Sequence, residues 1–353
     1  MQNFQAEIEV FANIPSNWIF LRDSVSATRA EKAIADLVNF SDDASLKLWN
    51  GSCQSIHIEV FESPTEFKHF AEIQNKKSQK WLPQTFARFS STISYTKADL
   101  NYCLQPSDSS MTTDEIPQEE LIAILLHTAL SELQSTIFDL YLALSIAHPG
   151  AIYFWECWQF CDKRFMGIEG GAMTSFDSAR KRAEELKWPE IRTLELRDVY
   201  GWLIKVAGFT DRQGTGQVGR AIAALSYLVK IKSKDENALS LVWALLGLEA
   251  LYGHGNVGLK TQILEKSEAL LGPRHENKKL FGWMYDFRSR LLHGDMDLLY
   301  QHNTHDADPT HEKISKELCE CESLATAMLL STLQNLCQRN SYSLEFGFTL
   351  KTK

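Results

Sequence analysis

The chain has 353 residues, an apolar fraction of 44% and a formal net charge of −9. The length allows more than one domain, and the charge argues against a protein that coats nucleic acid through a broad basic surface, although a local basic cleft remains compatible with it. The N-terminus lacks the features of a signal peptide, the longest apolar runs fall short of a membrane span, and the seven cysteines are scattered, so we expect a cytoplasmic protein with reduced thiols and no membrane partner.

The first part of the chain mixes predicted strands and helices. Alternating polarity and turn signals predict strands in four places: FQAEIEVF, NWIFLRD, both sides of Asn50-Gly51, and 86–105. Capping signals predict helices in two places: TRAEKAIADLVNF and the stretch after Ser63-Pro64. A long amphipathic helix then follows the polar loop QPSDSSMTTDE and ends at His148-Pro149-Gly150. After it, AIYFWECWQF is a candidate strand and GIEGGAMTSFDS is a predicted loop.

Beyond residue 179 the pattern is almost entirely helical. The predicted helices are 179–187, 195–208, 217–232, 237–252, 259–271, 276–294 and 311–338. The last stretch, SYSLEFGFTL, alternates and predicts a strand. We therefore expect an α+β protein with a mixed region over 1–180, an all-α domain over 186–340 and a C-terminal strand or tail over 341–353.

Three patterns have the composition of chemical sites but are explained more simply by structure. GTGQVG matches a dinucleotide-binding pattern, yet a helix precedes it where that site needs a strand, so we favour a loop between helices. A polar loop carries side chains of metal-ligating type, for which solvation is the simpler interpretation: His302, His305, Asp306, Asp308 and His311. Cys157 and Cys161 fit buried free thiols better than redox chemistry.

The strongest indication of a functional site is an arginine on a helix face that is otherwise apolar. At 100° per residue, Arg288 falls within an apolar helical stripe, whereas Arg290 points to the opposite face. A buried guanidinium without an anion costs several kcal/mol. Glu249 is the one charge in the apolar helix ALSLVWALLGLEALYG, so the economical prediction is that Glu249 and Arg288 share a site. By themselves the two residues fit a structural ion pair between helices equally well.

His293 favours chemistry over a purely structural pair. It follows Arg288 by five residues, so on an ideal helix the two side chains diverge by about 140°. A histidine suits general acid–base catalysis at neutral pH, and an arginine suits the spread negative charge of a pentacovalent phosphate. Together they resemble the minimum equipment for metal-free RNA cleavage, in which the ribose 2′-hydroxyl attacks the adjacent phosphate.

The segment RSRLLH fits the R-x4-6-H motif of HEPN domains, and LLGLEALYG with LFGWMYDFRSRLLHG resembles their ApeA-like branch. The resemblance covers about residues 186–338 and implies an all-α HEPN-like bundle with endoribonuclease activity and no cofactor or metal. It implies that Arg288 and His293 are the catalytic pair and that Glu249 is the third polar residue of RNase LS-like toxins. Four residues would support them: Ser289 in the motif's local geometry, Tyr285 and Asp286 in orientation, and Arg290 in the cleft.

HEPN nucleases usually act as two-fold dimers whose two motifs line one cleft, so the resemblance implies a homodimer in which Arg288 and His293 of different copies can meet. It further implies a toxin-like effector of antiviral defence (abortive infection) that cleaves single-stranded or loop RNA such as tRNA or mRNA, with a regulatory partner. The alternative is a catalytically inactive HEPN-like module for dimerisation or nucleotide binding. A weaker third option, a nucleotide-cofactor enzyme using GTGQVG, requires a strand before Gly214.

Overall fold

In a computed structural model of the chain, the described residues are 3–14, 24–48, 52–62, 85–96, 99, 117–154, 157–169, 173, 176–230, 237–254, 258–274, 278–296 and 309–347. The chain forms two compact units. Unit 1 comprises Met1–Tyr141 and Ile152–Ala172, and unit 2 comprises Leu142–Ala151 and Met173–Lys353. Both helices and a sheet are present, as expected for an α+β protein.

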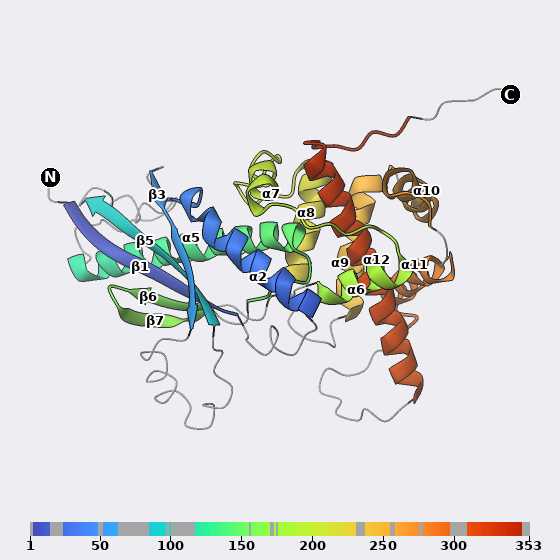
Figure 1. Cartoon of the computed structure of the whole chain (residues 1–353), viewed down its shortest axis with the longest axis horizontal. Helices are drawn as coiled ribbons and strands as arrows, with labels where there is room; N and C mark the ends of the chain where they lie inside the picture. The colour runs from blue at the N-terminus through green and yellow to red at the C-terminus, as the bar shows by residue number, and fades with distance from the viewer. Residues whose placement is uncertain are drawn as a thin grey trace. The chain divides into compact units, whose positions relative to one another are not determined.

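Unit 1 is built on a five-stranded antiparallel sheet (Figure 1). In spatial order its strands are β4 (His57–Glu62), β5 (Thr85–Thr96), β1 (Asn3–Ile14), β6 (Cys157–Cys161) and β7 (Arg164–Glu169). One face of β1 is apolar and buried, with Ile8 and Val10 fully enclosed. The long helix α5 (Gln118–Ala147) lies on this face of the sheet. Gln159 is opposite Val10 in the register, and its side chain donates a 2.8 Å hydrogen bond to Gln134 of α5.

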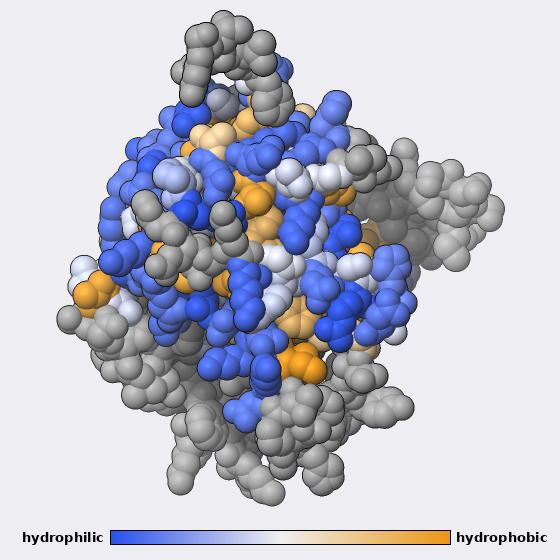
Figure 2. All heavy atoms as spheres, turned by 90° about the vertical axis from the view of Figure 1, so that its right-hand side faces the viewer, coloured by the Kyte–Doolittle hydropathy of each residue, from blue (hydrophilic) through white to orange (hydrophobic). Residues whose placement is uncertain are grey.

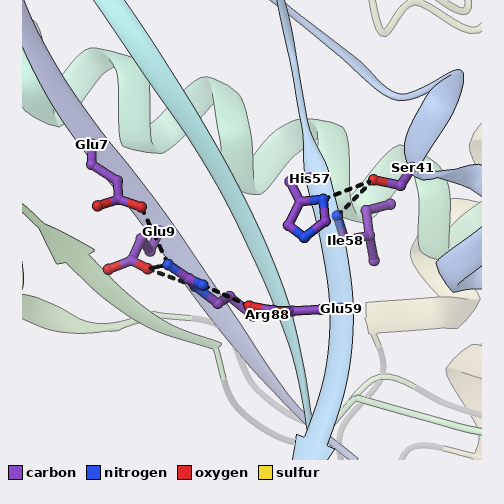
Figure 3. Close-up of polar contacts among 7 residues, drawn as sticks. All are labelled: Glu7, Glu9, Ser41, His57, Ile58, Glu59 and Arg88. Carbon is purple, nitrogen blue, oxygen red and sulfur yellow. Dashed lines mark hydrogen bonds and ion pairs between the residues drawn. The ribbon is translucent and has the colours of Figure 1, made fainter.

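The opposite face of the sheet carries an arginine surrounded by carboxylates (Figure 3). Arg88 of β5 forms ion pairs with Glu7 and Glu9 of β1 and with Glu59 of β4. Glu9 is 5% exposed, so its charge needs this partner. The cross-strand pairs therefore fix β4, β5 and β1 in register on a face that also holds an aromatic cluster around Phe11.

Several predictions for unit 1 are confirmed. The helix predicted over TRAEKAIADLVNF is α2 (Ser24–Asn39), which continues into η1 (Phe40–Asp42). The strands predicted on the two sides of Asn50-Gly51 are β2 (Ser45–Lys47) and β3 (Cys53–Ser55), which pair antiparallel, while Asn50 and Gly51 lie outside the described residues. The loop predicted over GIEGG is wrong in part, because Gly167 pairs with Gln159 inside β7. NWIFLRD before Ser24 and the helix predicted after Ser63-Pro64 lie outside the described residues, as does nearly all of 97–105.

By length and composition, α5 could also cross a membrane, and it is the one such helix within the described ranges. A core helix of a soluble protein passes the same test, and the hydrogen bond from β6 ties α5 to the sheet. The expectation of a chain without a membrane partner therefore stays a prediction.

Helices are the only regular secondary structure among the described residues of unit 2, and turns and irregular segments connect them. After the end of α5, its helices are α6 (Asp177–Leu186), α7 (Leu196–Leu203), α8 (Gly216–Lys230), α9 (Asn237–Tyr252), α10 (Leu259–Leu271), α11 (Lys278–His293) and α12 (Pro309–Gln338). The buried helix α12 packs most extensively against α9 and α6, and α9 also packs against α8, α10 and α11. Gly247 makes the α9–α12 approach possible, since a Cβ there would lie 2.8 Å from Leu329.

Two boundaries in unit 2 differ from the prediction. Helix α7 ends at Leu203, and turns replace the helix predicted to continue to 208. The terminal strand predicted over SYSLEFGFTL is wrong for its described part, 341–347, which has no strand pairing. Its apolar side chains dock on helices instead: Tyr342 stacks on Trp202 at 6.4 Å, and Phe346 lies 6.0 Å from Tyr252.

A buried carboxyl in α12 should make stability depend on pH. Burial raises the pKa of Glu322 from 4.5 to about 7, against the hydrogen bonds from Thr326 and Ser323. The folded state therefore holds the proton more tightly than the unfolded state, so the stabilisation is present below about pH 4.5 and is lost as pH rises through about 7.

We expect Glu322→Gln to raise the free energy of unfolding at pH 8 by at most about 3 kcal/mol and to change it little at pH 5. Urea denaturation at both pH values measures this, and exposed Glu312→Gln in the same helix is the matched control. An equal pH dependence in Glu322→Gln and the native chain would contradict the assignment.

Candidate functional site

Helices α9 and α11 bring Glu249 and Arg288 together. A guanidinium Nη2 of Arg288 lies 3.1 Å from Oε2 of Glu249, and the two side chains are 25% and 14% exposed. The predicted ion pair is therefore present. The residues one and four positions before each charge are buried and apolar: Leu245 and Leu248 in α9, and Met284 and Phe287 in α11. The pair lies at the boundary between this core and solvent.

The polar atoms of this pair are incompletely satisfied. Four buried side-chain atoms among the described residues have no hydrogen-bond partner, and three of them belong to this cluster: Glu249 Oε1, Arg288 Nε and the Tyr285 hydroxyl. Leaving such atoms unpaired usually costs about 1–3 kcal/mol each. Such buried groups call for an explanation, and a functional role is one of the explanations that apply to a cluster of them.

The electrostatics of the cluster favour proton acceptance by Glu249. Burial raises the pKa of the Glu249 carboxyl, and the charge and hydrogen bond of Arg288 lower it by less. Burial and the nearby Glu249 charge also raise the pKa of Tyr285, so its hydroxyl stays protonated and can donate. The site thus holds a carboxylate with a free oxygen, a neutral phenol and a guanidinium with a free N–H.

His293 occupies a defined place at the end of α11. Gly294 has φ 73°, the Asp295 N–H donates to the Arg290 carbonyl at 2.8 Å, and the Gly294 N–H donates to the Leu291 carbonyl at 3.4 Å. This is a Schellman cap, which needs a residue that tolerates the left-handed conformation. The glycine after His293 therefore ends the helix there and leaves the imidazole exposed. Within the part of the chain that is described, His293 has no hydrogen bond or ion pair with Arg288 or Glu249.

The residues predicted to support the pair divide between two faces. Tyr285 lies with Glu249 and Arg288, as its pKa shift reflects. Asp286 is exposed and lies 3.9 Å from Arg290 of the same helix, so these two side chains pair with each other on the outer face. Ser289 is also exposed. The structure therefore places Asp286 beside Arg290 and shows no contact between Asp286 and the Glu249–Arg288 pair within the described residues, and its supporting role stays a prediction.

The weaker candidates of the sequence have simple structural roles. Only Gly214 and Thr215 of GTGQVG lie in the connection after α7, and the other four residues form the first turn of α8, so the loop prediction is wrong in part. The described residues before the motif contain helix α7 and turns, and not the strand that dinucleotide binding requires. The glycines of the motif allow tight packing, since a Cβ on Gly214 would lie 2.7 Å from Ala223. Cys157 and Cys161 are buried cysteines outside any disulfide, and burial raises the pKa of Cys161 to about 11. The candidate metal loop around His302 and Asp306 lies outside the described residues.

A groove between α8 and α9 was not predicted. It has a volume of about 330 Å³ and is lined by Arg220 and Tyr227 of α8, by Trp243, Leu246 and Glu249 of α9, and by three alanines. The groove could not be predicted from the sequence because its aromatic side chains come from separate helices and have no motif spacing.

Figure 2 shows the side of the molecule that carries α10 and α11, where apolar side chains are exposed between hydrophilic ones.

Comparison of the chain with protein-family models found no match. Comparison with curated proteins and with solved structures also found none. The functional conclusion therefore rests on the residues of the site.

Proposed function

We propose that unit 2 is an HEPN-type domain and that the chain is a metal-independent endoribonuclease acting through Arg288, His293 and Glu249. The proposal rests on one observation: the motif arginine lies beside Glu249 in a cluster that contains three of the four unsatisfied buried polar atoms of the described residues. A phosphodiester supplies the acceptors that the Arg288 and Tyr285 donors lack. A ribose hydroxyl supplies the donor that the free Glu249 oxygen lacks.

The expected reaction is attack of a ribose 2′-oxygen on the adjacent phosphorus. The bond from phosphorus to the 5′-oxygen of the next nucleotide breaks, one proton leaves the 2′-hydroxyl, and one proton is added to the departing 5′-oxygen. Arg288 would stabilise the charge on the pentacovalent phosphate, which is the role of preorganised cations in such transition states. Glu249 and His293 are the candidate groups for the two proton transfers.

Because His293 is exposed and lies apart from Arg288, the proposal requires an arrangement that brings the two side chains into one cleft. The imidazole diverges from Arg288 around α11, so a cleft that contains both groups is most simply made from two copies of the chain. A two-fold dimer would place His293 of one copy against Arg288 of the other. Such a narrow cleft would accept unpaired RNA, whose bases are accessible, and would be compatible with the acidic net charge.

The position of His293 also favours a second candidate. If His293 never approaches Arg288, the helical unit would be a dimerisation or nucleotide-binding module, with Glu249 and Arg288 as a structural pair. Under the leading proposal, the chain would be a toxin-like effector of antiviral defence whose activity is restrained by a regulatory partner or by unit 1.

The chemistry of the RNA ends separates the two candidates. Expression of the chain is expected to produce RNA fragments with 2′,3′-cyclic phosphate and 5′-hydroxyl ends, because attack by the 2′-oxygen leaves these groups. The purified chain should produce the same ends on tRNA and mRNA in the presence of EDTA. Sequencing of the ends identifies the target and the cleaved bond. Fragments with 3′-hydroxyl and 5′-phosphate ends, or an intact RNA pool, would refute the ribonuclease proposal.

A further inference from the structure

The α8–α9 groove exposes an aromatic surface without an evident structural need. Tyr227 is 53% exposed, although its ring stacks on Trp243 with centroids 4.1 Å apart and planes 5° from parallel. Leu246 beside them is 37% exposed. These exposed side chains line the same groove. The two parallel rings also present a flat face, which is the shape that an unpaired base stacks on.

The other end of the groove is charged. Arg220 lies about two helical turns from Tyr227, or about 10 Å along the axis, and is exposed. No ion pair of Arg220 occurs among the described residues. Glu249 also contributes to the lining of the groove, and Arg288 contacts Glu249 from α11. The groove therefore runs from an aromatic surface to the predicted catalytic cluster.

We propose that the α8–α9 groove binds one unpaired nucleotide of an RNA strand, with its base on Tyr227 and its phosphate at Arg220. This rests on the proposed function for the identity of the strand as substrate. The volume of about 330 Å³ is at the small end of the range for ligand sites. Three alanines in the lining leave this space open between the helices. A nucleotide seated there directs the next phosphodiester toward Arg288.

Charge complementarity favours a nucleotide over an apolar helix of a second copy. A hydrophobic partner would cover the exposed guanidinium of Arg220 without offering it an acceptor. A nucleotide offers phosphate oxygens as acceptors to Arg220. Stacking does not distinguish bases strongly, so the groove is expected to accept any unpaired base.

The test uses the full chain and a labelled 2′-O-methyl oligoribonucleotide of mixed sequence, which cannot undergo 2′-oxygen attack. Fluorescence anisotropy measures its Kd. Tyr227→Ala is expected to weaken binding roughly 5- to 100-fold, whereas Tyr227→Phe keeps the ring and should stay within about twofold. Arg220→Ala should weaken binding and reduce the salt dependence by about one phosphate contact, with Arg220→Lys as its matched control.

Each other result overturns the proposal. Unchanged affinity in Tyr227→Ala, equal losses in the Ala and Phe variants, or no binding by the native chain exclude stacking in the groove. A change from dimer to monomer in Tyr227→Ala, measured by sedimentation, assigns the groove to contacts between copies. Cleavage is scored separately on natural RNA. If the oligonucleotide binds in the groove but natural RNA is not cleaved, only the ribonuclease proposal is refuted. If RNA is cleaved but the Kd is the same in Tyr227→Ala and the native chain, only the groove proposal is refuted.

Discussion

Arg288→Met is expected to lower the rate of RNA cleavage by about 10²–10³-fold or more, the usual effect of removing a preorganised group that stabilises charge in a transition state. The same change should also destabilise the fold, because it leaves the largely buried Glu249 carboxylate without its cation. Breaking a fully buried pair costs about 3–5 kcal/mol, and the partial exposure of this one places the expected loss nearer 2–3 kcal/mol.

A second substitution separates stability from catalysis. Combining Arg288→Met with Glu249→Leu replaces both charges by apolar side chains, which commonly restores the stability lost by breaking a pair. We expect urea denaturation to show a recovered free energy of unfolding and the cleavage assay to show no recovery. Arg290→Met is the matched stability control, because this exposed arginine of the same helix pairs only with the exposed Asp286 among the described residues, and it should change stability by no more than about 0.5 kcal/mol.

Recovery of cleavage in the double variant would contradict the catalytic assignment. The pair would then serve only to join α9 to α11, and the unsatisfied atoms around it would have another purpose. If the double variant stayed as unstable as Arg288→Met, apolar packing at this boundary would be poor, and the activity comparison would be repeated with Glu249→Gln in place of Glu249→Leu.

The pairing of Glu249 with Arg288 could be predicted because two physical requirements point the same way. Helical phase places each charge on a buried face, and neither can remain there without a counter-charge. The same reasoning gives no distance between His293 and Arg288, because their relation depends on how α11 ends and on what a second copy contributes. Gly294 shows the missing part: its left-handed conformation closes the helix directly after His293.

The errors along the chain have local causes. The alternation of Tyr342, Leu344 and Phe346 predicted a strand, but the rings of Tyr342 and Phe346 pack on aromatic residues of helices, and the described part of this segment pairs with no strand. The glycines of GIEGG predicted a loop where β7 is found. Gly167 is tolerated in this short strand because it lies beside an irregularity in the register. The α8–α9 groove escaped prediction because exposed Tyr227 has no periodic signal, and its stacking on Trp243 depends on the packing of two helices.

His293→Ala is expected to reduce cleavage by about 10²–10⁴-fold, the range for loss of a general acid or base. Its exposed side chain lies at the end of α11, outside the core, so the free energy of unfolding should change little. His293→Asn is the matched control, since it keeps a polar group that can hydrogen-bond but cannot exchange a proton at neutral pH, and it should be as inactive as the alanine variant.

Co-expression of His293→Ala with Arg288→Met tests whether the site is shared between copies. In a mixed two-fold dimer, one site combines the intact Arg288 of one chain with the intact His293 of the other, while the second site lacks both. With random pairing, half of the dimers are mixed and half of their sites work, so about a quarter of the native activity should return. A site made within one chain predicts no recovery, because every copy then lacks one of the two groups. Recovery would therefore explain why α11 points Arg288 toward Glu249 and His293 away from both.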